Sequence, residues 1–320
     1  MPCIIENSIL TKYTGNDTQF TVPEGVTEIG GHAFYNCTRL TQITIAESVS
    51  VIGDSAFWRT GLTQISIPES VTVIGVEAFY NCTSLTQITI RKGVTVINDR
   101  AFYNCRGLTQ ITIPEGVTEI GEEAFFQCTS LTQINIPDSV TKIGYAAFWK
   151  CTSLTQITIP KGVSVINSVS FANCSSLSQI TIPEGVTEIC QSVFQNCTGL
   201  THIAIPESVT KIGEHAFIKC TGLTRINIPV SVTEICEYAF YRCTELTPQI
   251  TIPESVTKIG NRAFSGCLSL SQINMSEGVT KIGFNAFAHG LSLSQITIPQ
   301  SVTLIGNNLF ESCSNLQRIL

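Results

Sequence analysis

Residues 78–90 read AFYNCTSLTQITI, and near-copies of this stretch recur along the whole chain. Its LTQITI segment has the L-x-x-I-x-I spacing of a short strand, with threonine and glutamine at the positions between the aliphatic residues. Because successive side chains of a strand point to opposite faces, the aliphatic ones share a face. The stretch therefore predicts one short strand in which Leu85, Ile88 and Ile90 face a core.

The leucine of this stretch recurs at a nearly constant spacing of 23 residues. The spacing is 22 between Leu40 and Leu62 and 24 between Leu246 and Leu270, and a phenylalanine keeps the same period. Thirteen copies of this unit cover the chain with no linker between them. We expect a single solenoid domain over residues 1–320, with an N-terminal cap at 1–22, repeats at 23–320 and an uncapped C-terminal end.

The position after VT-x-I in each repeat is nearly always small. It is glycine in nine coils, asparagine at Asn98 and Asn167, and cysteine at Cys190 and Cys236. Exchange between glycine and asparagine is typical of a left-handed backbone conformation. We therefore predict a positive φ at Gly121 and at Asn98.

The assembled pattern is L-x-x-I-x-I-P-x-x-V-x-x-I-G-x-x-A-F-x-x-C, and with it the chain resembles the BspA-like, or treponemal-type, leucine-rich repeat proteins over about residues 19–320. The opening ILTKYTGNDTQFTVPEGV is similar to the N-terminal cap of that family. The resemblance implies a β-rich α/β fold, a right-handed, curved solenoid with a parallel sheet on its concave face. It also implies a surface or secreted protein that takes part in adhesion to host proteins.

Composition and charge narrow the class of partner. A net charge of −6 argues against a nucleic-acid partner, because such proteins carry a basic stripe. No apolar run approaches the roughly 20 residues that span a bilayer. The opening MPCIIENSILTKYTGN lacks the basic start and apolar centre of a secretory signal. We expect a cytoplasmic protein or one exported without a leader, or a surface protein whose signal has been removed.

Catalytic and metal-binding patterns do not emerge from the sequence. The four histidines occupy different coils, and none has a cysteine or carboxylate at the spacing of a metal site. No glycine-rich phosphate loop is present. We therefore expect no enzyme activity, no metal and no cofactor.

Eleven cysteines share one position of the repeat, from Cys37 to Cys313. Cysteines stacked at the ~4.8 Å spacing of parallel strands have Cβ atoms farther apart than the ~3.5–4.5 Å that a disulfide prefers. We favour free, buried cysteines that act as small apolar groups, with disulfide, metal or redox use as alternatives. The row has gaps in the second coil, whose sequence is WRTGL, and at Gly290.

Polar residues of the strand segments form the first candidate binding surface. A row of glutamines is interrupted by His202 and Arg225, and the next segment contains an inserted LTPQITI with a proline, which predicts a bulge. The predicted contact residues are His202, Arg225, Gln249, Gln179 and Gln272. The alternatives are a solvated ladder of amides and hydroxyls, and simple drift of the repeat.

Aromatic residues form the second candidate surface. Each follows the core phenylalanine in one of six consecutive coils: Tyr35, Trp58, Tyr80, Tyr103, Phe126 and Trp149. Contiguous aromatic side chains are typical of surfaces that bind proteins or sugars. The alternative is that the rings cover the edge of the core.

Two functions remain open from the sequence. The first is a non-catalytic scaffold that binds a protein partner, with adhesion or host interaction as its setting. The second is a structural solenoid that forms a homodimer through Leu316, Ile319 and Leu320 in the last strand segment, because an unpaired strand invites a second chain.

Overall fold

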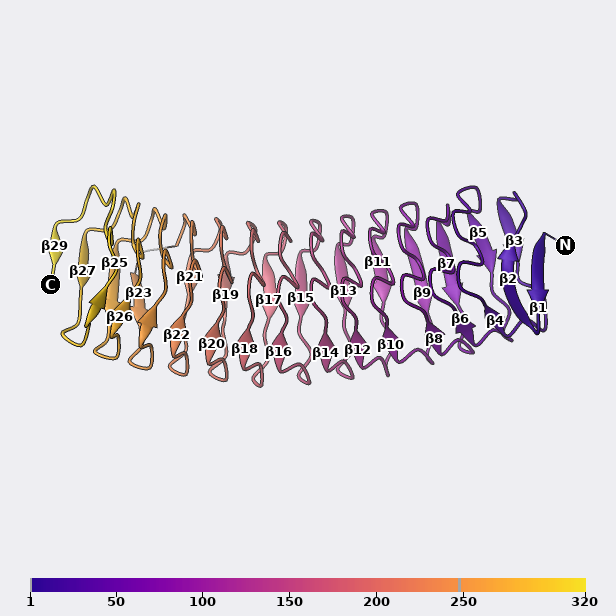
Figure 1. Cartoon of the computed structure of the whole chain (residues 1–320), viewed down its shortest axis with the longest axis horizontal. Helices are drawn as coiled ribbons and strands as arrows, with labels where there is room; N and C mark the ends of the chain where they lie inside the picture. Colours follow the sequence, from indigo (N-terminus) through magenta and orange to yellow (C-terminus); the bar gives the residue numbers. More distant parts are fainter. Residues whose placement is uncertain (1, 247–248) are drawn as a thin grey trace. The chain divides into compact units, whose positions relative to one another are not determined.

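The computed structural model describes residues 2–246 and 249–320 (Figure 1). These residues form strands β1 to β29 joined by turns, and no helix occurs among them. The expected leucine-rich-repeat solenoid of about 13 coils is confirmed, and it is built from strands and turns alone. Among the described residues, therefore, no helix is available that is long and apolar enough to cross a bilayer. The chain divides into two compact units, Met1–Gly162 and Val163–Leu320, which we call the N-terminal and C-terminal units.

The N-terminal unit starts with a hairpin. Strands β1 (Cys3–Glu6) and β2 (Ile9–Tyr13) pair antiparallel, and β2 then pairs in parallel with β4 (Glu28–Ile29). The short strands that follow β4 belong one to each coil, and all pairs recorded among them are parallel. They are β6 (Val51–Ile52), β8 (Val73–Ile74), β10 (Val96–Ile97), β12 (Glu119–Ile120) and β14 (Lys142–Ile143).

The LTQITI segments of the N-terminal unit form a second parallel sheet, which we call the strand face. Its pairs are in register, so that Gln87 lies opposite both Gln64 and Gln110. Glutamine and threonine point to solvent and the isoleucines between them are buried. The strands are β3 (Gln19–Thr21), β5 (Gln42–Thr44), β7 (Gln64–Ile67), β9 (Gln87–Ile90), β11 (Gln110–Thr112), β13 (Gln133–Asn135) and β15 (Gln156–Thr158).

The C-terminal unit repeats this plan. Its strand face contains β17 (Gln179–Thr181), β19 (His202–Ile203), β21 (Arg225–Ile226), β23 (Gln249–Ile252), β25 (Gln272–Met275), β27 (Gln295–Thr297) and β29 (Arg318–Ile319). Its short strands are β16 (Val165–Ile166), β18 (Glu188–Ile189), β20 (Lys211–Ile212), β22 (Glu234–Ile235), β24 (Lys258–Ile259), β26 (Lys281–Ile282) and β28 (Leu304–Ile305). The proline predicted to form a bulge, Pro248, lies outside the described residues.

A column of phenylalanines forms the centre of each unit. In the N-terminal unit consecutive rings from Phe34 to Phe148 are stacked with centroids 5.1–5.4 Å apart. All are fully buried. Each coil supplies one ring to this column and cannot bury it alone, so the coils stabilise one another by stacking.

The predicted positive φ at Gly121 and Asn98 is wrong. Neither residue lies in the left-handed region. Close approach of the preceding coil favours glycine at position 121, because a Cβ there would lie 2.6 Å from the backbone nitrogen of Asp99. The left-handed residues are instead the one before the repeat alanine and the one before the repeat cysteine, for example Glu77 (φ 56°) and Asn81 (φ 63°).

Candidate functional site

The six aromatic side chains singled out from the sequence form one continuous stack in the N-terminal unit, which we call the aromatic row. Its members are Tyr35, Trp58, Tyr80, Tyr103, Phe126 and Trp149. Consecutive ring centroids lie 4.3–5.5 Å apart, and consecutive ring planes differ by only 3–13°. The structure therefore brings all the predicted residues of this surface together.

The aromatic row is only partly covered. Tyr35 is 48% exposed, and the other five side chains are half-buried. Arg59 lies 5.3 Å from the Trp58 ring and Lys150 lies 5.0 Å from the Trp149 ring. The rings thus contact one another and retain an open side, in contrast to the fully buried phenylalanine column.

The local backbone explains why the rings line up. Each ring precedes a left-handed residue whose N–H donates to the carbonyl of the ring-bearing residue in the next coil, as from Asn81 to Tyr103 at 2.7 Å. The ring residue itself donates to the left-handed residue three positions earlier, as from Tyr80 to Glu77 at 2.9 Å. Two hydrogen bonds per coil therefore fix the backbone beneath each ring. Burial raises the pKa of Tyr103, so this phenol is held neutral.

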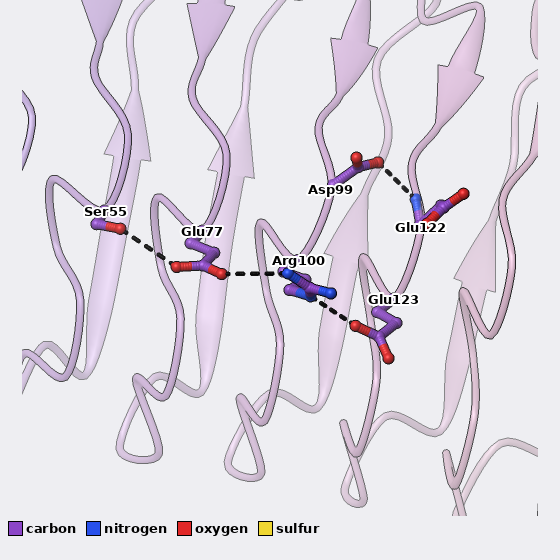
Figure 2. Close-up of polar contacts among 6 residues, drawn as sticks. All are labelled: Ser55, Glu77, Asp99, Arg100, Glu122 and Glu123. Carbon is purple, nitrogen blue, oxygen red and sulfur yellow. Dashed lines mark hydrogen bonds and ion pairs between the residues drawn. The ribbon is translucent and has the colours of Figure 1, made fainter.

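A chain of charged side chains follows the same turns (Figure 2). Arg100 Nε lies 2.6 Å from Glu123 Oε2, and Arg100 Nη1 lies 3.6 Å from Glu77 Oε1. Ser55 Oγ donates to Glu77 Oε2 at 3.5 Å, and the backbone N–H of Glu122 donates to Asp99 Oδ1 at 2.7 Å. One arginine thus connects three adjacent coils beside the aromatic row.

The predicted strand-face residues lie on the exposed face of the C-terminal unit. His202 and Arg225 are paired neighbours on β19 and β21, and both are exposed. Gln249 pairs with Gln272 in the same way. The ring nitrogen Nδ1 of His202 lies 3.1 Å from Thr201 Oγ1. Gln179 is exposed on β17. Binding at this surface stays a prediction.

The strand face of the N-terminal unit contains a hollow that the sequence pattern did not predict. Its volume is about 400 Å³, and Gln42, Gln64 and Gln87 form its floor with Glu47 and Arg91 at its rim. The sequence does contain a departure from the repeat at this place, because Arg91 occupies a position that is proline in ten coils. The hollow therefore offers amide and hydroxyl hydrogen-bonding groups together with the carboxylate of Glu47 and the guanidinium of Arg91.

The repeat cysteines other than Cys37 and Cys313 are buried, and their thiols form hydrogen bonds in the core. Cys105 Sγ donates to the carbonyl of Phe79 at 3.1 Å, and Cys128 donates to that of Phe102 at 3.2 Å. Burial raises the pKa of the Cys82 thiol to about 11. In the second coil Thr60 takes the cysteine position, and its Oγ1 lies 3.2 Å from Cys82 Sγ. The expected gap in that coil is therefore filled.

The last coil leaves apolar side chains uncovered. Ile319 is 56% exposed and Leu320 is 61% exposed, whereas Leu316 is half-buried. Leu304 on β28 is 58% exposed. The residues predicted for self-association are thus accessible.

Comparison with known proteins identifies the repeat. The family model of the BspA type leucine rich repeat region matches this chain over three ranges, residues 4–132, 118–247 and 247–320. The chain belongs to the BspA-type leucine-rich repeat family. No curated protein matches the sequence.

Solved structures of other BspA-type or leucine-rich repeat proteins resemble this chain along its whole length. A leucine-rich repeat protein from Bacteroides ovatus is 28% identical, with a TM-score of 0.70 over 100% of this chain and 85% of that one. A leucine rich cell surface protein from Faecalibacterium prausnitzii is 31% identical, with a TM-score of 0.55 over 99% of this chain and 86% of that one. A protein from Eubacterium ventriosum is 25% identical, with a TM-score of 0.57 over 97% and 89%.

The BspA-type fold explains what this arrangement can do chemically. Its coils place side chains of equivalent positions next to one another in rows, as in Gln64, Gln87 and Gln110. Among the described residues, no three His, Cys, Asp or Glu side chains form a group that could hold a metal ion. The aromatic row and the strand faces are partly exposed surfaces built from such rows.

Proposed function

We propose that this BspA-type repeat protein is a non-catalytic scaffold that binds a protein partner through the aromatic row. The observation that carries the proposal is the aromatic row itself. Its six rings stack on one another, and each remains partly exposed to solvent. Tyrosine and tryptophan are enriched among residues that dominate protein–protein binding energy.

Rigidity adds to the argument. Stacking on both sides fixes each inner ring before a partner arrives, so that little side-chain entropy is lost on binding. Half-exposed rings also present an apolar face beside a polar phenol or indole edge, which suits a protein surface of mixed character.

We place this function at a cell surface. The relative from Faecalibacterium prausnitzii is a cell surface protein that covers nearly the whole chain. That likeness supports a surface location, and we propose adhesion or host interaction as the setting.

The test is a selection from a phage-displayed random peptide library on the immobilised protein. The selected peptides are then measured against a double variant, Trp58→Gln with Tyr80→Gln, and against the control Tyr145→Gln. Glutamine is chosen because the chain itself has Gln195 at the ring position of a later coil. Tyr145 is 48% exposed, as is Tyr35, but lies outside the row.

We expect a class of peptides that bind the wild type and the Tyr145→Gln control equally and lose affinity at least about tenfold for the double variant, because hot-spot aromatics each contribute ~2 kcal/mol or more. Selected peptides that all bind the double variant as well as the wild type would contradict the aromatic row as the contact surface.

A second candidate function is self-association through the last coil. The exposed apolar side chains of Ile319, Leu320 and Leu304 favour it. Sedimentation of the wild type and of Leu304→Lys separates the two ideas. A dimer that dissociates in the variant supports self-association, and a monomer at all concentrations contradicts it.

A further inference from the structure

The C-terminal unit contains a hollow of about 740 Å³ that neither the aromatic row nor the strand faces explain. We call it the basic groove. Its walls carry the cationic side chains of Lys219 and Arg242 and the imidazole of His289, with Tyr241 and Leu268 as its apolar part. It is rimmed by Asn196, Thr198, Thr221 and Thr244. Lys219, Arg242 and His289 are all exposed.

The groove arises where the repeat departs from its own pattern. The ring position after the core phenylalanine holds Tyr241, then the small Ser265 and Ala288. The next position, left-handed in every coil, holds Lys219 and Arg242, then Gly266 and His289. Gly266 has no side chain, and the side chain of Arg242 lies against it. A Cβ at that residue would lie 3.1 Å from Arg242 Cγ.

The charged side chains that line the groove are of one sign. Its lining contains no carboxylate, and no ion pair recorded for residues 2–246 and 249–320 includes Lys219 or Arg242. The acidic residue that follows in the ring row, Glu311, accepts a hydrogen bond from Asn285 Nδ2 at 2.9 Å. A concentrated positive surface thus occurs in a chain whose net charge is −6.

The guanidinium of Arg242 is held in place for an anion. It lies 5.3 Å from the centre of the Tyr241 ring, and the Tyr241 ring in turn contacts Tyr238 edge to face at 5.5 Å. A guanidinium stacked on a ring keeps its N–H edges free, and those edges match the two oxygens of a carboxylate. Because Arg242 covers one face of Tyr241, that face is not available for stacking of a sugar ring.

We propose that the basic groove binds a carboxylate-bearing peptide segment of a protein partner. Arg242 takes one carboxylate through paired N–H groups, and Lys219 takes a second one coil away. His289 offers a ring nitrogen on the far side of Gly266. Leu268, which is 38% exposed, contacts an apolar residue between the acidic ones. This site is independent of the aromatic row and lies in the other unit.

The probe is a fluorescein-labelled, C-terminally amidated hexapeptide of alternating glutamate and leucine, and its binding to the full chain is measured by fluorescence anisotropy. The matched peptide with glutamine in place of glutamate is the ligand control. We expect saturable binding of the glutamate peptide that weakens as salt is raised, and at least about tenfold weaker binding of the glutamine peptide, because charge-assisted hydrogen bonds are lost. Equal binding of the two peptides would overturn the proposal.

Two protein variants locate the site. Arg242→Gln removes the guanidinium, and Gly266→Asn displaces the Arg242 side chain with a residue that the chain itself has at this left-handed position in Asn81 and Asn104. Each is expected to weaken binding of the glutamate peptide at least about tenfold. The control is Arg59→Gln, since Arg59 has the same position in its coil and also lies 5.3 Å from a ring, that of Trp58, but does not line the groove. We expect it to change binding less than about twofold.

Two outcomes would overturn the assignment. The first is an equal loss of affinity in Arg59→Gln and Arg242→Gln, which would mean unspecific attraction to exposed cations. The second is displacement of the peptide by a heparin hexasaccharide at a lower concentration than by the unlabelled glutamate peptide, which would assign the groove to a sulfated glycan. The aromatic-row variant Trp58→Gln/Tyr80→Gln should bind the glutamate peptide as tightly as the wild type does. The proposal for the aromatic row and the proposal for the basic groove are therefore tested separately.

Discussion

The indole of Trp58 lies 5.5 Å from the ring of Tyr80, and the two planes are only 3° from parallel. Tyr80 makes the same contact with Tyr103 on its other side, at 4.5 Å. Beneath them Phe57 and Phe79 stack at 5.1 Å in the core. The phenylalanine column and the aromatic row therefore run side by side along the N-terminal unit, the first buried and the second exposed on one side. The proposed function rests on the aromatic row.

Tyr80→Gln should lower the free energy of unfolding by about 1–3 kcal/mol, since two stacking contacts worth roughly 0.5–1.5 kcal/mol each are lost. Urea denaturation followed by circular dichroism measures the change. The exposed Tyr145, which stacks on none of the rings recorded for the described residues, gives the control Tyr145→Gln, with a change within about 0.5 kcal/mol. Equal effects of the two substitutions would mean that the stack adds no stability.

Arg100→Gln should destabilise the chain by about 0.5–1 kcal/mol, because it leaves Glu77 and Glu123 without their shared cation. The pairs are partly exposed, with 47% of the Arg100 side chain accessible, so solvent screening keeps the effect small. Lys142→Gln breaks the single pair with Glu119 and should cost less. The difference in unfolding free energy between Arg100→Gln and Lys142→Gln should become smaller in 1 M salt. A difference that is the same at low and high salt would mean that Arg100 stabilises the chain by packing and not by charge.

Gly121→Ala should lower the free energy of unfolding by about 1–3 kcal/mol, because the added Cβ overpacks the contact with the backbone of Asp99. The matched substitution is Gly116→Ala, where φ is +101° and the space is open. That change should cost about 1 kcal/mol through backbone strain alone. Urea midpoints of the two variants test the distinction, and an undisturbed Gly121→Ala protein would refute the steric explanation.

Alkaline pH should weaken the fold through its buried thiols. Burial raises the pKa of Cys82 from 9.0 to about 11 and also raises that of Cys105. Between pH 9 and 11 the unfolded chain therefore loses protons that the folded chain keeps, so stability falls as pH rises. Each such thiol contributes up to about 1.4 kcal/mol per pH unit.

Urea titrations at several pH values between 8 and 11 measure that slope. Cys105→Thr should make the slope of unfolding free energy against pH smaller by the contribution of one thiol, because threonine does not titrate. The chain itself has a threonine at this repeat position, Thr60. An unchanged slope in the variant would show that the repeat cysteines are not the groups that titrate.

Much of this structure could be predicted from the sequence because the repeat is so regular. Leu85, Ile88 and Phe79 recur with a fixed period, and a period fixes which side chains share the core. The aromatic row also follows from the period, since Trp58 and Tyr80 occupy the same position of successive coils and parallel stacking in register must bring them together.

Backbone conformation and the volume of the basic groove depend on geometry that the repeat period does not determine. The exchange of glycine and asparagine at Gly121 and Asn98 does not reflect a left-handed backbone. The left-handed positions instead hold residues as different as Glu77 and Asn81, and glycine at position 121 is favoured by close approach of the neighbouring coil. The basic groove depends on two small residues, Ser265 and Gly266, next to a large one. Its departure from the repeat was visible, but the volume it leaves depends on how the surrounding side chains pack.

The most direct test of the central claim uses tryptophan fluorescence. The chain has two tryptophans, Trp58 and Trp149, and both belong to the aromatic row. Acrylamide quenching of their emission therefore reports on the accessibility of this surface alone. With the tightest row-dependent peptide from the library bound at saturation, we predict a clearly lower quenching constant than for the free protein. An unchanged quenching constant in the saturated complex would contradict binding at the aromatic row.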